Sequence, residues 1–229
     1  MDAKTRHVGL ARARDKTYYE RWMEKEGIPI VEGYGVTDAQ KIALKAWKRL
    51  GCDGAYLQFR GLEGITGAYV GKIAPETATH PERHLYEKVV YILQGEGVAE
   101  IQQRDRVPQT ISWQTGSLFS PPLNALHRLI NHSKKPAVFL AVTTAPMVLD
   151  HFHNEHFVFN SDYAFNERYD GEQRFFEPRN DRYLATNNRQ WIWETNFIPD
   201  ARKATIDADR KSTRLNSSHS AKSRMPSSA

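Results

Sequence analysis

Cysteine is almost absent from this chain of 229 residues, since Cys52 is the only one. A single thiol cannot close an internal disulfide, which fits a reducing compartment. No apolar run approaches the ~20 residues that a membrane-spanning helix needs. The polar, basic residues 1–14 have no apolar stretch behind them, which argues against a secretory signal. We therefore expect a cytoplasmic protein that does not contact a membrane.

Several common functional motifs are also missing. The chain has no G-x4-G-K-[ST] phosphate loop and no G-x-S-x-G turn of the hydrolases. Cysteine is too scarce for a zinc finger. Lys and Arg are spread along the chain, which argues against binding to nucleic acid. A small molecule is the expected partner.

The formal net charge of +5 comes mostly from the C-terminal end. Residues 209–229 carry five basic residues and one acidic residue, a net charge of +4. When back-translated, residues 209–219 and 223–229 resemble two stretches of a sequencing-adapter oligonucleotide, in the right order. We interpret residues 209–229 as an artefactual tail, disordered because it is poor in large apolar residues. The natural product is then expected to continue beyond Ala208.

Residues 1–54 predict an N-terminal arm with short helices. Aromatic and apolar side chains in residues 15–26 are spaced for one face of an amphipathic helix, and Gly27 ends it. Residues 38–50 form either a second short helix or an irregular segment. We expect the arm to pack on the following domain or on a partner subunit.

From residue 55 the sequence changes to short runs separated by Gly, Pro and polar clusters. Many of these runs are rich in β-branched and aromatic residues, which predicts strands. The predicted strands cover residues 55–59, 65–73, 88–93, 98–102, 109–113, 118–120, 125–131 and 137–144. Gln94 to Gly97 is typical of a tight hairpin turn. Eight short strands with turns between most of them favour an all-β sandwich or jelly roll.

Residues 146–208 are expected to form a connector and the start of a truncated second domain. Residues 147–155 predict a short helix, and residues 190–197 predict a strand. His151 and His153 resemble a pair of metal ligands, but residues two apart on a helix do not face each other. We interpret them as surface or packing side chains.

The strongest chemical signal is the pattern Gly116-x5-Pro122-x-Asn124-x2-His127-x3-Asn131. It resembles the second conserved motif of the cupins, G-x5-P-x-G-x2-H-x3-N, whose histidine holds a metal ion. Asn124 replaces a turn glycine, and Asn is the other residue that tolerates a left-handed turn. The resemblance implies that residues 55–145 form a cupin double-stranded β-helix, a jelly-roll barrel, behind the N-terminal helical arm. It also implies that His127 ligates a metal.

The first cupin motif, G-x5-H-x-H-x(3,4)-E-x6-G, is present only in part. When the motif is aligned on Gly95, His84 stands at its second histidine and Glu82 at its first. Lys88 stands where the motif has glutamate. A protonated lysine cannot ligate a metal, and an inward-pointing cation would oppose one.

The resemblance therefore implies a divalent metal held by His84, His127 and Glu82. Two histidines and one carboxylate form the facial set of non-haem Fe(II) oxygenases. Glu87 and His80 lie nearby but out of register, and they join the set only if a bulge shifts the strand. Fe(II) is the expected ion, with Mn, Ni or Zn as alternatives, because such ligand sets accept several metals.

Two functions remain open. Residues 18–208 resemble the N-terminal half of bacterial two-cupin proteins, which include gentisate 1,2-dioxygenase-like enzymes that open aromatic rings with Fe(II) and O₂. This implies a metal-dependent oxidoreductase of the dioxygenase type, acting on a small acid that is aromatic in the gentisate case. The alternative is a non-catalytic cupin that binds a small molecule or scaffolds a bicupin dimer. Exposed barrel edges and an aromatic arm are compatible with a homodimer.

Overall fold

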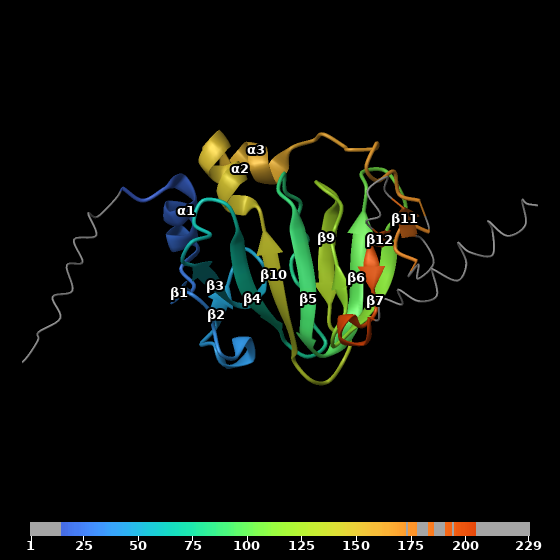
Figure 1. Ribbon diagram of the computed structural model, residues 1–229, viewed down its shortest axis with the longest axis horizontal. Coiled ribbons are helices and arrows are strands. Elements are labelled where there is room, and N and C mark those ends of the chain that lie inside the picture. Colours follow the sequence, from blue (N-terminus) through green and yellow to red (C-terminus); the bar gives the residue numbers. More distant parts are fainter. Residues whose placement is uncertain (1–14, 173, 178–182, 186–190, 194, 205–229) are drawn as a thin grey trace, which may run out of the picture.

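The computed structural model describes residues 15–172, 174–177, 183–185, 191–193 and 195–204. Two β-sheets face each other, and three short helices gather at one end of them (Figure 1). The helices are α1 (Tyr18–Glu26), α2 (Ala145–Phe152) and α3 (Glu155–Asn160). None of the described helices is long and apolar enough to cross a bilayer. The segment interpreted as an artefactual tail, residues 209–229, lies outside the described residues.

The larger sheet has eight strands in the order β1-β3-β4-β10-β5-β8-β13, with β2 paired to β3 beside this path. Its pairings are antiparallel except for β1 with β3. The bounds are β1 Ile30–Gly33, β2 Lys45–Trp47, β3 Cys52–Phe59, β4 Gly67–Ile73, β5 Lys88–Gln94, β8 Leu118–Phe119, β10 Ala137–Thr143 and β13 Phe197–Ile198.

The smaller sheet has the order β7-β6-β9, formed by Gln109–Gln114, Glu96–Gln102 and Leu126–Ile130. The chain passes from one sheet to the other at Gly95, between β5 and β6, where φ is +99°. A Cβ there would lie 2.8 Å from the Cβ of Ala137. The predicted turn therefore needs glycine both for its backbone conformation and for space. A separate hairpin pairs β11 (Tyr183–Ala185) with β12 (Trp191–Trp193).

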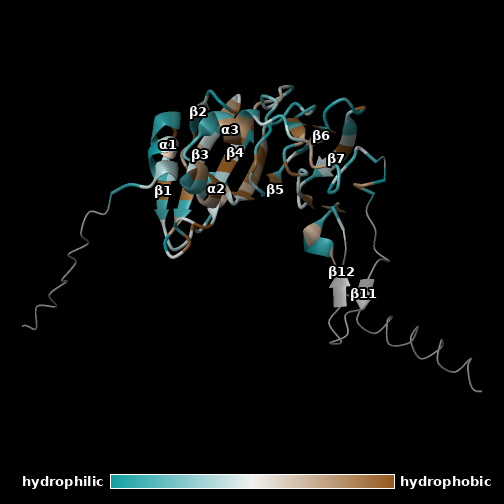
Figure 2. Ribbon diagram, turned by 90° about the horizontal axis from the view of Figure 1, so that it is seen from above, coloured by the Kyte–Doolittle hydropathy of each residue, from teal (hydrophilic) through white to brown (hydrophobic). Residues whose placement is uncertain are grey.

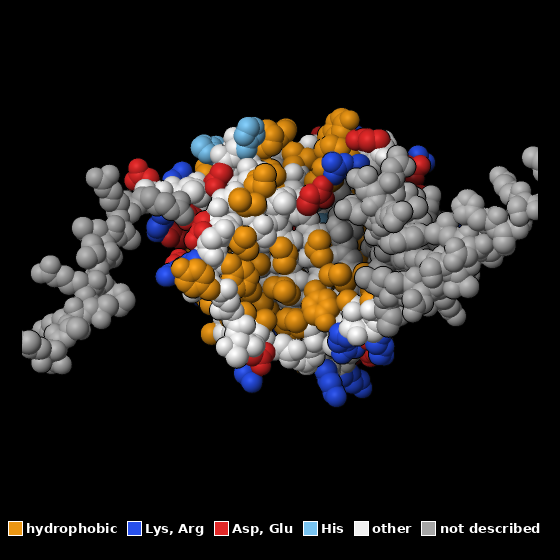
Figure 3. Space-filling model, viewed as in Figure 1, with side chains coloured by type: hydrophobic (Ala, Val, Ile, Leu, Met, Phe, Trp, Pro, Cys, Tyr) orange, Lys and Arg blue, Asp and Glu red, His pale blue; other side chains and the backbone are white. Residues whose placement is uncertain are grey.

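Side chains alternate between the barrel interior and its surface along the strands. In β5 the side chains of Lys88, Val90 and Ile92 are buried, whereas Val89 is 42% exposed. Figure 2 shows apolar stretches on β4 and β5 and polar residues on α1 and in the loops. Apolar side chains also gather on one outer face of the molecule (Figure 3). Val89 of β5 and Val142 of β10, which stand opposite each other in the larger sheet, are both exposed.

The all-β jelly-roll fold predicted from the sequence is confirmed. Each of the eight predicted strands is present, with ends that differ by up to three residues. The first helix is also present: Thr17 and Glu20 form a capping box at its start, and Gly27 ends it with φ +70°. Tyr19, Trp22 and Met23 of this helix are buried in the core, so the arm packs on the barrel as expected.

Three parts of the secondary structure differ from the prediction. Of the two alternatives for residues 38–50, the short helix was wrong. The segment contains a 3₁₀ turn (Ala39–Lys41) and the edge strand β2. The strands β1 and β2 were not predicted. β1 pairs with a part of β3 that is distant in the sequence, whereas β2 is a three-residue strand in a local hairpin with β3. The helix expected over residues 147–155 is divided into α2 and α3 because His153 adopts φ +49° and Asn154 caps the next helix.

The strand expected over residues 190–197 corresponds to β12 and the start of β13, on either side of residue 194, which is not described. Phe197 and Ile198 pair with Phe119 and Leu118 of β8. Residues 197–198 therefore extend the larger sheet. The second domain remains a prediction.

Candidate metal centre

The candidate centre lies where residues 77–84 run alongside β9. The backbones of Glu82 and His127 exchange two hydrogen bonds of 2.9 Å, so these two residues stand directly opposite each other. The backbone N–H of Thr79 donates to the carbonyl oxygen of Leu129, and the N–H of Leu129 donates to Oγ1 of Thr79, each at 2.9 Å. Glu82 and His84 are two residues apart, which lets both side chains reach the same face of this extended segment.

Three ligand atoms, one each from Glu82, His84 and His127, all lie within 4.8 Å of one another. Nε2 of His127 is 3.7 Å from Oε1 of Glu82. The two imidazole rings are 5.1 Å apart between centroids and nearly perpendicular. His84 and His127 are only 2% and 4% exposed. The structure therefore brings together the three side chains that the sequence assigned to the metal.

The backbone fixes the orientation of both imidazoles. Nδ1 of His84 donates to the carbonyl oxygen of Tyr86 at 2.8 Å, and Nδ1 of His127 donates to that of Ala125 at 2.9 Å. A carbonyl only accepts, so the proton of each neutral ring is on Nδ1 and the lone pair is on Nε2. Within the described residues, both buried Nε2 atoms lack a hydrogen-bond partner. Unpaired imidazole nitrogens next to a carboxylate fit a metal ion.

Both histidines are held in the neutral form that ligates metals. The pKa of His127 is lowered to about 4, mainly by burial and secondly by the charge of Lys88. Burial also holds the pKa of His84 well below its usual value, with added effects of Lys88 and His127. Neither ring needs to lose a proton at neutral pH to bind an ion.

Glu82 is ionised because two cations surround it. Burial opposes its charge, but Lys88 and Arg49 outweigh burial and hold the pKa of the carboxyl well below its usual value. Oε1 accepts from Nζ of Lys88 at 2.5 Å, and Oε2 accepts from Nη1 of Arg49 at 3.0 Å. Burial lowers the pKa of Lys88, while the Glu82 carboxylate counteracts this by favouring the ammonium.

Lys88 points into the barrel, as its register in the motif indicated, and its side chain is 4% exposed. Any ion bound here has a buried ammonium as a neighbour. Nε2 of His127 and Oε1 of Glu82 are 3.7 Å apart, slightly more than the ~3 Å that separates two ligand atoms with bonds of ~2.1 Å to one ion.

Sequence reasoning did not find Arg49, which comes from the N-terminal arm. Its Nε donates to Glu26 of α1 at 2.9 Å. Its guanidinium lies over the rings of Trp47, Trp22 and Phe159, at 4.7, 5.2 and 5.5 Å from their centroids. No local pattern marks a residue 33 positions before Glu82 as its partner.

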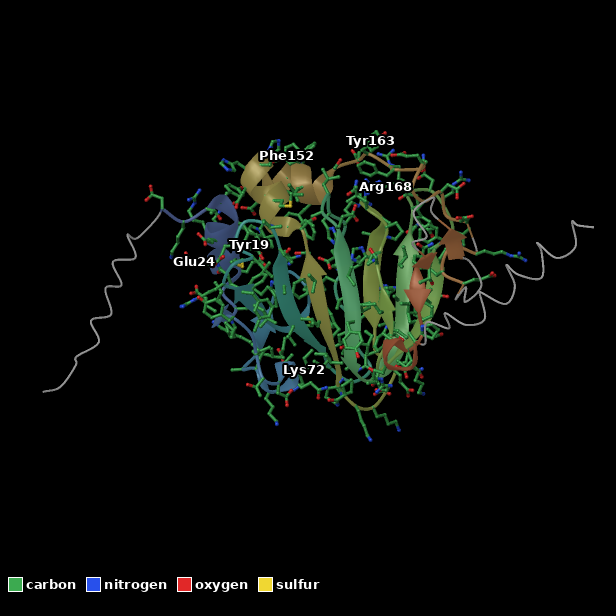
Figure 4. The ribbon with its side chains drawn as sticks, in the orientation of Figure 1. Tyr19, Glu24, Lys72, Phe152, Tyr163 and Arg168 are labelled. Atoms are coloured by element: carbon green, nitrogen blue, oxygen red, sulfur yellow. The ribbon has the colours of Figure 1, made fainter. Side chains whose placement is uncertain are left out.

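The structure does not bring Glu87 or His80 to this group. Glu87 directly precedes the inward-facing Lys88, and its carboxylate pairs with Arg168 at 2.6 Å where both side chains are about half exposed; Arg168 is labelled in Figure 4. His80 is exposed, and its Nδ1 lies 3.3 Å from the carbonyl oxygen of Arg49. No bulge shifts the start of β5, so Lys88 faces inward and Glu87 does not.

The other motif residues shape the loop before His127. Asn124 has φ +58°, which confirms that it fills the left-handed turn position. Its side-chain amide donates to the carbonyl oxygens of Ser161 and Tyr163. Asn131 is buried and donates to three backbone carbonyls, which anchor the end of β9.

His151 and His153 lie outside the centre, on the surface of α2 and its C-terminal cap. His153 stacks on Tyr18 with ring centroids 5.0 Å apart. They are surface and packing side chains, as interpreted.

The model of the cupin domain family matches residues 69–143. Among solved structures, the chain is similar to the plu4264 protein from Photorhabdus luminescens, with 19% identity and a TM-score of 0.40 over 52% of this chain and 94% of that chain. It is similar to an oxalate decarboxylase from Lactobacillus farciminis, with 18% identity and a TM-score of 0.41 over 51% and 40% of the two chains. It is also similar to the 7S globulin of Momordica charantia, with 16% identity and a TM-score of 0.38 over 42% and 29%.

The chain thus spans less than half the length of the oxalate decarboxylase and of the globulin. No curated protein matches it. The family match falls on the strands that carry Lys88 and His127, and the facing sheets have the predicted jelly-roll arrangement. Residues 69–143 of this chain therefore match the cupin domain family, and they lie in a jelly-roll fold.

Proposed function

We propose that this protein is a metal-dependent cupin oxidoreductase of the dioxygenase type that acts on a small acid. The observation that supports this most strongly is the pair of unpartnered Nε2 atoms of His84 and His127, buried beside the Glu82 carboxylate. Two imidazoles and one carboxylate are the ligand set of non-haem Fe(II) oxygenases, so Fe(II) is the proposed ion, with Mn, Ni or Zn as alternatives.

The bound ion would supply a Lewis acid and a template for the substrate. The chain's own residues orient and enclose the site. The backbone carbonyls of Tyr86 and Ala125 fix both imidazoles, and Arg49 holds one oxygen of Glu82. The ring of Tyr86 stacks on His84 at 3.8 Å, which shields this face of the imidazole from water.

Metal content tests this proposal directly. The full chain is loaded anaerobically with Fe(II) or with Mn(II), desalted and measured by elemental analysis. We expect one ion per chain, loss of that ion in His127→Ala, and its retention in His151→Ala, which removes an exposed histidine. Oxygen uptake with a series of small aromatic and aliphatic acids then tests the reaction class. A folded chain that retains no ion would refute the proposal.

One observation favours a second candidate, a metal-free cupin that binds a small molecule or scaffolds a larger assembly. The ammonium of Lys88 already neutralises Glu82 inside the barrel, at 2.5 Å. In this case a chelator leaves both the stability and the ligand binding of the protein unchanged. A cytoplasmic location, a homodimer and a second domain that starts within residues 146–208 remain predictions under either function.

A further inference from the structure

The candidate centre lies near one end of the barrel. His127 is the second residue of β9 and Lys88 is the first residue of β5, while Glu82 and His84 come just before β5. β6 ends and β7 begins at this same end, because β6 pairs antiparallel with both β7 and β9. Further along the strands, buried apolar side chains fill the interior: Ile92, Ile111, Trp113 and Leu129. The centre is therefore closer to solvent through this end than through the other.

One segment of irregular backbone crosses this end of the barrel. Residues 161–168 leave α3 and run above β5 and β9 in Figure 1, and Tyr163 and Arg168 are labelled at this end in Figure 4. Val158 before the segment is fully buried, and Tyr169 after it is 2% exposed. None of the side chains of residues 161–168, a range described in full, is buried. This strap, residues 161–168, is thus anchored in the core at its two ends and has no hydrophobic anchor between them.

Polar contacts hold the strap to the barrel. Three of them are exposed or long: Arg168 with Glu87 at 2.6 Å, Arg104 with Asp162 at 3.8 Å, and Gln103 with Asn166 at 3.5 Å. Exposed ion pairs contribute little to stability, and a hydrogen bond at the limit of its distance range is weak. These three contacts alone would leave the strap loosely held.

The side chain of Asn124 makes the buried contact with the strap. Asn124 is 6% exposed, and its amide donates to the carbonyl oxygens of Ser161 at 3.0 Å and Tyr163 at 2.7 Å. Its backbone N–H donates to the carbonyl oxygen of His84 at 3.1 Å. The cupin motif has glycine at this position, and glycine has no side chain to make the first two bonds. Asn124 therefore joins the strap to the segment that carries His84.

We propose that the strap is a gate over the candidate centre and that the Asn124 amide holds it closed. The side chains of Glu82, His84 and His127 are at most 11% exposed, so an ion or a substrate reaches them only when part of the structure moves. The strap moves away from the barrel end when the two hydrogen bonds of the amide and its weak contacts break. Its role in access rests on the proposed function, because it concerns the ion, whereas its attachment through Asn124 does not.

A gate changes rates and leaves affinity unchanged. If the ion enters and leaves only while the strap is open, both rates are proportional to the open fraction, which cancels from Kd because the strap supplies no ligand. The loss of two hydrogen bonds shifts such an equilibrium by about tenfold or more. A residue that instead positions His84 for the ion changes Kd.

Two variants remove the amide donor. Asn124→Gly restores the residue of the motif at a position with φ +58°, and Asn124→Asp keeps the size of the side chain but replaces the donor with an acceptor. Binding of Co(II) to the full chain is followed by stopped-flow absorbance, and excess chelator then removes the ion. We expect both variants to raise the association and dissociation rates about tenfold or more and to keep Kd within about twofold. Glu87→Gln breaks only the exposed pair with Arg168, so its rates should change by less than about fivefold.

Trypsin tests the strap without any ion. The bond between Arg168 and the buried Tyr169 is cleaved only when the strap opens, and the rate of cleavage then follows the open fraction. We expect faster cleavage at this bond in both Asn124 variants. Cleavage after Arg60, which is exposed in the turn after β3, is the internal control and should stay the same.

The outcomes separate the gate from the proposed function. Unchanged Co(II) rates in both Asn124 variants overturn the gate, even where trypsin shows a looser strap. A weaker Kd with an unchanged association rate also overturns it, because Asn124 then acts on the position of His84. If the unaltered chain binds no Co(II), the proposed function fails, and the cleavage after Arg168 alone decides whether Asn124 holds the strap.

Discussion

Arg49 is the residue through which the N-terminal arm reaches the candidate metal centre. Its side chain, 23% exposed, bridges Glu26 of α1 and Glu82. Removing one partner of a buried ion pair leaves a carboxylate without compensation, which typically costs ~3–5 kcal/mol. Arg49 therefore contributes both to the fold and to the position of Glu82.

The substitution Arg49→Met should lower the free energy of unfolding by ~3 kcal/mol, since Glu26 loses its cation and Glu82 keeps only Lys88. Urea denaturation measures this change. Arg128→Met is the matched control, because Arg128 pairs with Glu100 at 2.7 Å where both side chains are 30% exposed or more. An exposed pair contributes ~0–1 kcal/mol. Equal losses in the two variants would contradict the role assigned to Arg49.

The buried histidines predict that the metal-free protein is sensitive to acid. The pKa of His127 is lowered to about 4 in the fold, against ~6.5 in an unfolded chain. The unfolded state therefore binds more protons between these values, and stability falls as the pH drops from ~6.5 toward 4. This one group accounts for a loss on the order of 3 kcal/mol, and His84 acts in the same direction.

Urea denaturation in the presence of a chelator, at a series of pH values from 7.5 to 4.5, tests this dependence. His127→Gln should flatten the slope because it removes the titrating ring. His151→Ala, at the surface, should keep the slope. A slope that is unchanged in His127→Gln would show that other groups cause the acid sensitivity.

At the scale of elements, the turn between β5 and β6 links the two sheets. Gly95 has φ +99°, and a Cβ there would lie 2.8–2.9 Å from the Cβ and Cα of Ala137. Gly61 has a similar φ of +92° but open space around it. A substitution at Gly61 therefore introduces backbone strain alone, whereas a substitution at Gly95 also introduces a steric conflict.

We expect Gly61→Ala to destabilise the protein by ~1–2 kcal/mol, the cost of a left-handed backbone for an L-residue. Gly95→Ala should cost clearly more, because β10 must also move to make room. Thermal and urea unfolding of both variants measure the difference. If the two variants are equally stable, the contact with Ala137 relaxes without cost.

The sequence predicted those strands and helices that are marked by residues within the element or at its ends. The eight barrel strands are short β-rich runs between turn residues, and Thr17, Glu20 and Gly27 mark the ends of α1. The edge strand β1 was missed because its partner in β3 is distant in the sequence, and β2 was missed because its local hairpin with β3 has only three residues in this strand. The same limit applies to the site: motif spacing located Glu82, His84, Lys88 and His127, but Arg49 reaches Glu82 through tertiary packing alone.

At the scale of the whole molecule, the candidate centre connects parts that are far apart in the chain. His127 lies on β9, Glu82 and His84 lie on the segment before β5, and Arg49 ties Glu82 to the arm and α1. An ion that binds the folded state but not the unfolded state stabilises all of these parts together. At an ion concentration ~100 times Kd the gain is ~2.7 kcal/mol.

For a domain of ~150–250 residues, ~1 kcal/mol corresponds to ~2–4 °C in Tm, so this gain should raise the Tm by about 5–10 °C. The measurement is a thermal melt of the chelator-treated protein with and without Mn(II). His127→Ala should show no shift, and His151→Ala should show the full shift, since only His127 belongs to the ligand group. In His127→Ala only Glu82 and His84 remain to hold an ion at the centre, so binding there should be weaker. A full Tm shift in this variant would therefore mean that the ion binds elsewhere on the protein.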